Sequence, residues 1–340
     1  DEISWHNQLL KFLNSETTRK IATDCIWQSG FTETVINKML LLLKNKNISP
    51  YAFSRFVFMP HKNEIPERLL QEILSVLLCH SDSASIGICT ELAQISYFGK
   101  ESSRAFPEEL IFNILSAVPS EKKQNQMYGY YWKIMANKFL KKYSERSIEL
   151  LDHILGHMDR VSRFGNSSYI AKVADEIVIA HPSASWKIIS KHLLAESSIN
   201  RFGIINWLGE SGFEDRPETG VINYLPHDEI IDWIKESSEE RLWIIKQVLP
   251  KTLDKDKGGL LTANFIEDFC SDNDSIVSLF GHFWSGGWTG PESQYLERKR
   301  DTARKWLAQT SSLKIQLWLE KYIEYLNSRI EKTQIDEERE

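Results

Sequence analysis

Hydrophobic positions recur along much of this chain with the spacing of a helix that is buried on one face. The stretch from Ile65-Pro66-Glu67 onward matches the stretch from Phe106-Pro107-Glu108 onward at an offset of 41 residues, and Pro, Glu, Leu, Ile, Leu and Ser recur in place. Within each copy, apolar residues stand at i, i+4 and i+5, starting from Leu69 and from Leu110. This spacing places them on one side of a helix.

Weaker copies of the same pattern continue the series. Leu150, Ile189 and Ile230 begin them, so that the five anchors, Leu69 and Leu110 included, are 41, 40, 39 and 41 residues apart. A period of about forty residues is typical of HEAT and armadillo repeats, which are built from short helices. One match of this kind arises by chance easily, but five at even spacing predict a repeat.

Each repeat has the parts of a helical hairpin. Pro stands in the first turn of the clearest first helices, where its missing N–H costs nothing. A polar break such as Ser81-Asp82-Ser83 or Glu236-Ser237-Ser238 follows and offers N-cap oxygens to a second helix. The predicted second helices are Ile86–Phe98, Gln126–Lys142, Tyr169–Ala180, Phe202–Glu210 and Glu240–Leu249.

Two short helices cannot bury all their apolar surface alone, so neighbouring pairs must stack. The predicted fold is therefore all-α, an α-solenoid of stacked helical hairpins resembling HEAT or armadillo repeats. We expect the repeat array to cover 61–250. Phe56-Val57-Phe58-Met59 is the one β-prone run, and it ends at Pro60.

The flanks fit the repeat less closely. Residues 1–60 are predicted to form further helical units, with helices at Trp5–Phe12, Ile21–Trp27 and Val35–Leu43. Residues 251–340 are predicted to form a C-terminal helical cap that begins with an exposed loop, Thr252–Gly259. The helices expected in this cap are Phe265–Cys270, Ser275–Trp284, Glu292–Gln309 and Ser312–Glu331.

Composition agrees with a folded protein of this class. Hydrophobic residues make up 42% of the chain and aromatic residues 11%, which argues against disorder. A net charge of −6 gives no general attraction to nucleic acid or to anionic lipid. No apolar run approaches the roughly eighteen residues of a membrane span.

The cysteines bear on the cellular compartment of the protein, and the first residues bear on whether the chain is part of a longer one. Cys25, Cys79, Cys89 and Cys270 are scattered, which predicts reduced core residues of a cytoplasmic protein. The chain opens Asp-Glu-Ile-Ser-Trp, with neither an initiator Met nor a signal peptide. We therefore expect it to be the C-terminal part of a longer protein.

No catalytic, cofactor-binding or metal-binding site is predicted. His153 and His157 are four residues apart on a helix, but no Glu stands beside the first and no third zinc ligand is near. Asp254 and Asp256 are followed by Gly258-Gly259, yet the position where a calcium loop needs Glu is Phe265. Glycine-rich phosphate loops are absent as well. We therefore expect a binding protein rather than an enzyme.

Two regions are candidates for partner binding. One combines aromatic residues with cations, in a helix and in a later basic run, as single-stranded nucleic acid requires. The other is a Gly-rich segment between two tryptophans, and tryptophan is a favoured interface anchor. The competing interpretation places the aromatics in the core and the cations in solvent. The candidates are Tyr128, Tyr131, Trp132, Lys138, Lys142, Arg298, Arg300 and Arg304 in the first, and Trp284 and Trp288 in the second.

A resemblance to a known family rests on four features of the sequence. They are the forty-residue units, the segment Trp284–Pro291, the two helices after it that carry Trp306 and Trp318, and the Glu/Arg-rich end. The chain resembles the HEAT-like helical C-terminal region of large bacterial anti-phage defence proteins. In those proteins a sirtuin-like, nuclease or nucleotide-binding STAND module comes first. The resemblance implies that the helical array recognises a phage component or holds an oligomer together.

The prediction for function follows from the fold. We expect a regulatory or scaffolding helical-repeat domain that binds a protein partner, which is phage-derived or a second copy of the chain. The alternative is a helical repeat that binds nucleic acid, and the net acidity counts against it. Neither a cofactor nor a membrane is expected as a partner.

Overall fold

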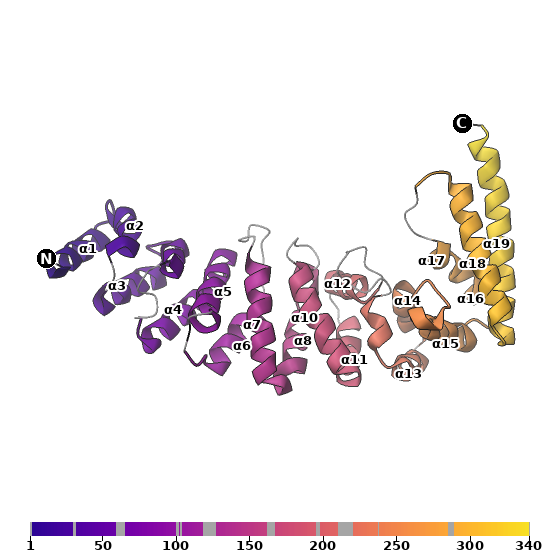
Figure 1. Ribbon diagram of the computed structural model, residues 1–340, viewed down its shortest axis with the longest axis horizontal. Coiled ribbons are helices and arrows are strands. Elements are labelled where there is room, and N and C mark those ends of the chain that lie inside the picture. Colours follow the sequence, from indigo (N-terminus) through magenta and orange to yellow (C-terminus); the bar gives the residue numbers. More distant parts are fainter. Residues whose placement is uncertain are drawn as a thin grey trace. The chain divides into compact units, whose positions relative to one another are not determined.

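The computed structural model is built from helices (Figure 1). Every regular element in the described part of the chain is helical, so the all-α class is confirmed. The structure describes residues 2–29, 32–58, 65–99, 102, 104–117, 127–161, 167–194, 198–209, 220–236, 238–284 and 289–339.

The chain divides into two compact units, Asp1–Ile177 and Val178–Glu340. This division falls inside the predicted repeat array rather than at residue 60 or 250. The two units are separated by the density of contacts within each, whereas the segments 1–60, 61–250 and 251–340 are predicted from the repeat pattern of the sequence. The boundaries of these segments therefore stay a prediction.

The first unit contains the helices up to α10, whose last residues lie beyond the boundary. Its elements are α1 (Glu2–Asn14), α2 (Arg19–Ser29), α3 (Glu33–Lys44), η1 (Pro50–Phe58), α4 (Glu67–His80), α5 (Ser83–Phe98), α6 (Glu108–Ser116), α7 (Tyr128–Lys142), η3 (Ser144–Arg146), α8 (Ser147–Leu155), α9 (Met158–Val161) and α10 (Ser167–Ala180).

The second unit ends in two long helices. Its elements are α11 (Pro182–Leu193), α12 (Ser198–Leu208), η4 (Val221–Tyr224), α13 (His227–Glu236), α14 (Ser238–Val248), η5 (Lys255–Lys257), α15 (Gly259–Phe269), α16 (Asn273–Ser278), α17 (Phe280–Trp284), α18 (Glu292–Gln309) and α19 (Leu313–Glu337).

The five predicted anchors all lie in helices, which we call the first helices: α4, α6, α8, α11 and α13. Leu69, Leu150, Ile189 and Ile230 are fully buried, whereas Leu110 is half-buried. The predicted second helices are also present, as α5, α7, α10, α12 and α14. The hydrophobic spacing therefore identified both the helices and their buried faces.

Four of the five predicted hairpins pack as pairs, and the fifth, α8 with α10, is not among the main helix contacts of the described residues. In the first unit, α4 packs on α5 and α6 on α7, and in the second α11 packs on α12 and α13 on α14. First helices also contact first helices, α4 with α6 and α6 with α8, while α5 contacts α7. In the second unit α11 contacts α13 and α12 contacts α14. Neighbouring first helices and neighbouring second helices thus contact each other in both units, although α10 is not part of this set of contacts.

Residues Phe56–Phe58 of the β-prone run close the 3-10 helix η1, where Phe53 and Phe56 stack in the core with ring centroids 5.3 Å apart. Two predicted helices differ from the structure. The predicted helix Ser275–Trp284 is broken at Leu279 into α16 and α17. The last helix extends to Glu337, six residues beyond its predicted end. Tertiary packing, rather than local preference, decides these cases.

The C-terminal end of the second unit has an aromatic core. Trp318 on α19 is fully buried, and its ring stacks on Tyr322 with centroids 5.2 Å apart. Phe283 on α17 approaches Trp318 to 4.9 Å, and Phe280 lies 5.3 Å from Tyr322. These contacts hold the short helix α17 against the long final helix.

The cysteines differ in burial. Cys89 and Cys270 are buried as expected, but Cys79 is exposed and Cys25 is half-buried, and none of the four forms a disulfide. The prediction that all four lie in the core is therefore wrong for Cys79. Among the described helices, none is both long enough and apolar enough to cross a membrane.

Candidate binding surfaces

Two of the predicted partner-binding aromatics are core residues. The Trp132 side chain on α7 is fully buried, and its indole N–H donates a hydrogen bond to the Leu115 carbonyl at 2.9 Å. Tyr128 is buried too, and its hydroxyl donates to the Ala117 carbonyl at 3.2 Å. Both acceptors belong to the end of α6, where the last helical carbonyls lack partners within the helix. These rings therefore close the end of α6 and do not form part of an exposed surface.

The polar candidates on the same helix lie at the surface but touch neighbouring elements. Lys138 donates from Nζ to the Phe98 carbonyl at 2.8 Å, at the end of α5. The Lys142 ammonium lies 4.7 Å from the centroid of the Phe106 ring. Tyr131 is half-buried. Burial raises the pKa of its hydroxyl, and the nearby Glu91 carboxylate raises this pKa further. The two lysines thus contribute to packing, and a role in partner binding stays a prediction.

Large apolar side chains are exposed mainly on one kind of helix within the repeat region. Among the described residues, the first helices α4, α6, α8, α11 and α13 expose none. The second helices other than α5 do expose such side chains, and we call this set the second-helix apolar residues. They are Tyr130 on α7, Ile179 on α10, Ile199 and Phe202 on α12, and Trp243 on α14.

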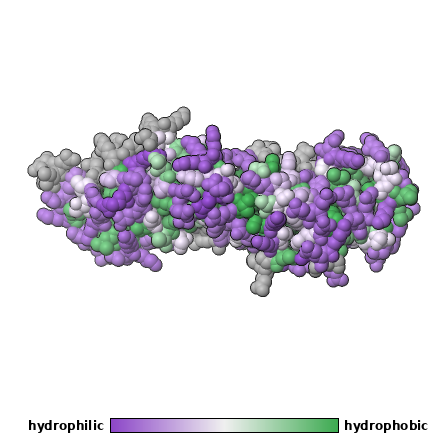
Figure 2. Space-filling model, turned by 90° about the horizontal axis from the view of Figure 1, so that it is seen from below, coloured by the Kyte–Doolittle hydropathy of each residue, from purple (hydrophilic) through white to green (hydrophobic). Residues whose placement is uncertain are grey.

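The exposure is greatest on α12 and α14. Phe202 has 62% of its surface exposed and Trp243 has 53%, values expected of charged residues rather than of large rings. Their helices pack on each other and are tied by an ion pair between Arg201 and Glu240 at 2.6 Å. On the face of the molecule in Figure 2, hydrophilic residues predominate and hydrophobic residues appear in separate areas. Exposed aromatic rings on a polar surface are typical of protein interfaces.

The basic run of α18 separates into two faces. Arg300 and Arg304 both face Asp301, with nitrogen–oxygen distances of 3.4 and 3.5 Å. Arg298, together with Lys299, faces the other way and lines a pocket. The sequence grouped these cations by proximity along the chain, but the helix places them on different sides.

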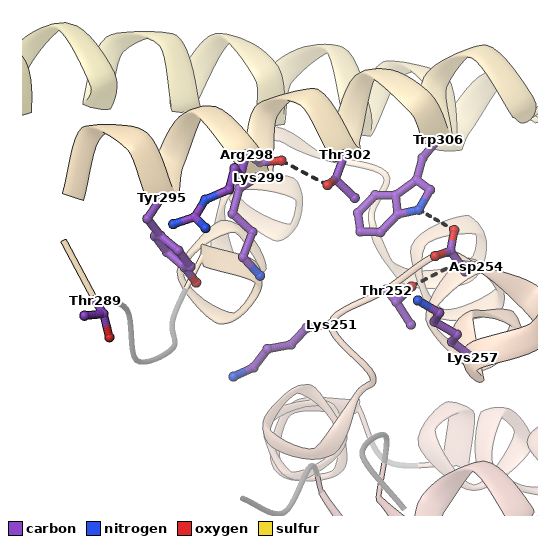
Figure 3. Close-up of a pocket in the computed structure, with 10 residues that line it drawn as sticks. All are labelled: Lys251, Thr252, Asp254, Lys257, Thr289, Tyr295, Arg298, Lys299, Thr302 and Trp306. Carbon is purple, nitrogen blue, oxygen red and sulfur yellow. Dashed lines mark hydrogen bonds between the residues drawn. The ribbon is translucent and has the colours of Figure 1, made fainter. Parts of the chain in front are cut away.

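The pocket lies between α18 and the loop that joins α14 to α15 (Figure 3). Its cavity volume is about 830 Å³. The α18 wall carries residues at helical spacing, so that one face of the helix points into the cavity. The lining residues are Tyr295, Arg298, Lys299, Thr302 and Trp306 on α18, Lys251, Thr252, Asp254 and Lys257 on the loop, and Thr289.

One hydrogen bond joins the two walls of this pocket. The Trp306 indole N–H donates to Asp254 Oδ1 at 2.7 Å, and the Asp254 amide donates to Thr252 Oγ1 at 3.0 Å. Trp306 is nearly buried, with 8% of its surface exposed. The segment Thr252–Gly259, expected as an exposed loop, is therefore anchored to α18, although Lys255, Asp256 and Lys257 are exposed.

Two glycines fit this loop tightly against its surroundings. Gly258 has φ of 81°, and a Cβ there would lie 2.2 Å from the Asn223 side-chain oxygen. A Cβ on Gly259 would lie 2.3 Å from the Leu253 carbonyl carbon. Both positions therefore require glycine, one for its backbone conformation and both for space.

The tryptophan candidates separate as well. Trp284 is half-buried, with the Arg329 guanidinium of α19 4.7 Å from its ring centroid. Its carbonyl accepts a hydrogen bond from the Tyr295 hydroxyl at 2.9 Å. Trp284 thus joins α17 to both long helices, in agreement with the interpretation of a ring that closes the core. Trp288 lies outside the described residues.

Several pocket residues were not predicted as site residues from the sequence: Lys251, Thr252, Lys257, Thr289, Tyr295, Thr302 and Trp306. Tyr295, Lys299 and Thr302 are spaced four and three residues apart, so helical periodicity alone places them on one face of α18. The loop residues give no such signal, because only folding brings them opposite α18.

His153, the first residue of the histidine pair, has a structural role. The His153 ring makes an edge contact with Phe112, with centroids 5.6 Å apart. Within the residues that the structure describes, no group of three or more His, Cys, Asp or Glu side chains is placed to hold a metal ion. His227 begins α13, and Asp228 and Glu229 stand in its first turn, where the helix dipole favours acidic side chains.

Comparison of the chain with protein-family models, with curated proteins and with solved structures finds no match.

Proposed function

We propose that this chain is a helical-repeat domain that binds a protein partner through its second helices. The observation that carries the proposal is the distribution of exposed apolar side chains: Phe202 and Trp243 lie on second helices, and the described first helices expose none. Exposing large rings to water is unfavourable unless a partner covers them. Aromatic residues are also the side chains that most often dominate interface energies.

The repeat architecture supports the proposal. Within each unit, first helices pack on first helices and second helices on second helices, as stacked hairpins do. The spacing from Leu150 to Ile189 is 39 residues, close to the 40 and 41 residues between the other anchors. We therefore propose α-solenoid repeats of HEAT or armadillo style, in which second helices form the binding layer.

The size of an ordinary interface is compatible with such a layer. A stable protein complex buries roughly 800 Å² on each partner. Three second-helix apolar residues lie on α12 and α14 alone, and polar side chains around them provide the rim that interfaces usually have. In a larger bacterial defence protein, which the resemblance implies, this domain would be the cytoplasmic recognition or scaffolding part.

Variants of the full chain test the proposal. Phe202→Glu combined with Trp243→Glu places charges on the second helices, and the matched control, Lys187→Glu with Asp232→Lys, alters exposed positions on the first helices α11 and α13. Partners that co-purify with the unaltered chain are identified, purified and titrated against each variant. We expect the second-helix variant to weaken binding by at least about tenfold, which corresponds to 1.4 kcal/mol, and the control to bind normally. A partner that is lost only from the control, or the absence of any saturable partner, would contradict the proposal.

A further inference from the structure

The pocket of Figure 3 concentrates positive charge in a chain whose overall charge is negative. Four of its lining residues are cations, Lys251, Lys257, Arg298 and Lys299, and Asp254 is the one carboxylate among them. The chain as a whole has a net charge of −6. A concave site lined by several cations attracts anions.

The single carboxylate of the lining accepts a hydrogen bond from another side chain. Asp254 Oδ1 accepts the indole N–H of Trp306 at 2.7 Å. The acidic residue therefore helps to fix the loop and contributes a structural contact. In Figure 3, the Lys251 and Lys299 side chains extend into the space between the loop and α18.

The remaining polar groups of the pocket suit an oxyanion. Three threonines line it. The Thr302 hydroxyl donates to the Arg298 carbonyl at 2.9 Å, so the hydroxyls of Thr252 and Thr289 are the ones that can donate to a ligand. Lysine ammonium groups, the arginine fork and hydroxyls are the side chains that donate hydrogen bonds to phosphate oxygens. Carboxylate ligands use the same donors, but phosphate groups carry more charge per group and match four cations better.

The volume distinguishes one anion from a larger ligand. A cavity of about 830 Å³ far exceeds a single tetrahedral anion and lies within the range of small-molecule sites, roughly 300–1,000 Å³. Tyr295 adds a half-buried aromatic ring at the edge, with the Lys299 ammonium 5.5 Å from its centroid. We infer that this pocket binds a compact ligand with two or more linked phosphate groups, such as the polyphosphate of a nucleotide.

A nucleic-acid strand fits these observations less well. A strand needs cations along an extended track, whereas Arg300 and Arg304, the next cations on α18, are paired with Asp301 on another face. The four lining cations are gathered in one concave site. This site is independent of the second helices, so the inference goes beyond the proposed protein-binding function.

Direct binding measurements test the inference. The full chain is titrated by calorimetry at low ionic strength with inorganic triphosphate, with ATP and with a single-stranded oligonucleotide. The test variant, Lys251→Ala with Arg298→Ala, removes two lining cations. The matched control, Arg300→Ala with Arg304→Ala, removes two cations from the other face of α18, and thermal unfolding verifies that both variants are folded.

We expect saturable binding of triphosphate or ATP that weakens at least about tenfold in the test variant, a change of 1.4 kcal/mol, and does not change in the control. The affinity should fall as salt is added, because the interaction is between charges. Tighter binding of ATP than of triphosphate would indicate that the nucleoside part of ATP contacts Tyr295. No binding of either phosphate probe, equal loss in both variants, or binding of the oligonucleotide that triphosphate does not displace would overturn the inference.

Discussion

Trp306 and Asp254 are 52 residues apart in the chain, yet the indole N–H of Trp306 lies 2.7 Å from Asp254 Oδ1. This bond fixes the loop between α14 and α15 against α18. Because Trp306 is nearly buried, the bond exchanges little with water. The shape of the cationic pocket depends on this contact, since Asp254 and Trp306 belong to its two walls.

Replacing Trp306 with Phe should destabilise the second unit. The change keeps an aromatic ring but leaves the Asp254 carboxylate without its indole donor, at a cost of about 1–2 kcal/mol. Urea unfolding measures the free energy of unfolding of each variant. Asp254→Asn, which keeps an acceptor oxygen, serves as the conservative comparison. A double-mutant cycle with Asp254→Ala should give a coupling energy of about 0.5 kcal/mol or more. Additive effects would mean that the hydrogen bond contributes nothing.

Gly258→Ala should also destabilise the fold. The φ of 81° is unfavourable for alanine, and its Cβ would meet the Asn223 side chain, so we expect a loss of more than about 1 kcal/mol. The matched control is Gly281→Ala in α17, where nothing lies within 4 Å of the added carbon. That change should be neutral or stabilising by up to about 1 kcal/mol, because alanine favours helix. Equal thermal midpoints for the two variants would contradict this account of the loop.

The part of the fold that the sequence predicted rests on local periodicity. Leu69, Leu150, Ile189 and Ile230 recur at a fixed spacing, and all four are buried in first helices. A buried face leaves a signal in every turn of a helix, so it is readable without any knowledge of tertiary contacts. Residue 279 shows the opposite case, because the break between α16 and α17 depends on how Phe280 and Phe283 pack against α19.

The binding surfaces were harder to predict for a related reason. Tyr128, Trp132, Met135, Ala136 and Phe139 follow one stripe of α7, and all are buried. Aromatic residues near lysines in the sequence thus marked a core face beside a polar one, rather than a mixed surface. Lys251 and Lys257 reach the pocket only because the loop folds back against α18. No pattern of residues near them in the chain specifies that contact.

The N-cap of α5 should make stability depend on pH. Asp82 accepts hydrogen bonds from the amides of Ala84 and Ser85, both at 3.0 Å. Burial alone would raise the pKa of Asp82, but the hydrogen bonds from Ser85 and Ala84 outweigh it and hold the pKa below its usual value. A carboxyl with a lowered pKa in the folded state stabilises the fold at neutral pH, and this contribution is lost as the pH falls below about 4.

Two substitutions of Asp82 test this cap. Asp82→Ala removes it and should cost about 1 kcal/mol at neutral pH, an amount limited by the exposure of the side chain. Asp82→Asn keeps an acceptor oxygen, so it should retain most of the stability and lose the contribution that titrates. Unfolding midpoints are compared between pH 3 and pH 7, in about one-unit steps. A difference between the unaltered chain and Asp82→Asn that does not change over this range would exclude the carboxylate as a titrating cap.

Trp132 and Tyr130 lie two residues apart on α7 and should respond in opposite ways to truncation. Trp132→Ala empties a fully buried site and removes the bond to the Leu115 carbonyl, at an expected cost of about 3–5 kcal/mol. Tyr130 is 42% exposed, and Tyr130→Ala should cost less than about 1 kcal/mol. Since the first variant can fail to fold, Trp132→Phe supplies an intermediate loss that urea unfolding still resolves. If Tyr130→Ala destabilised the chain as much as Trp132→Phe, the division of α7 into a core face and an exposed face would be wrong, and with it the place of Tyr130 among the proposed binding residues.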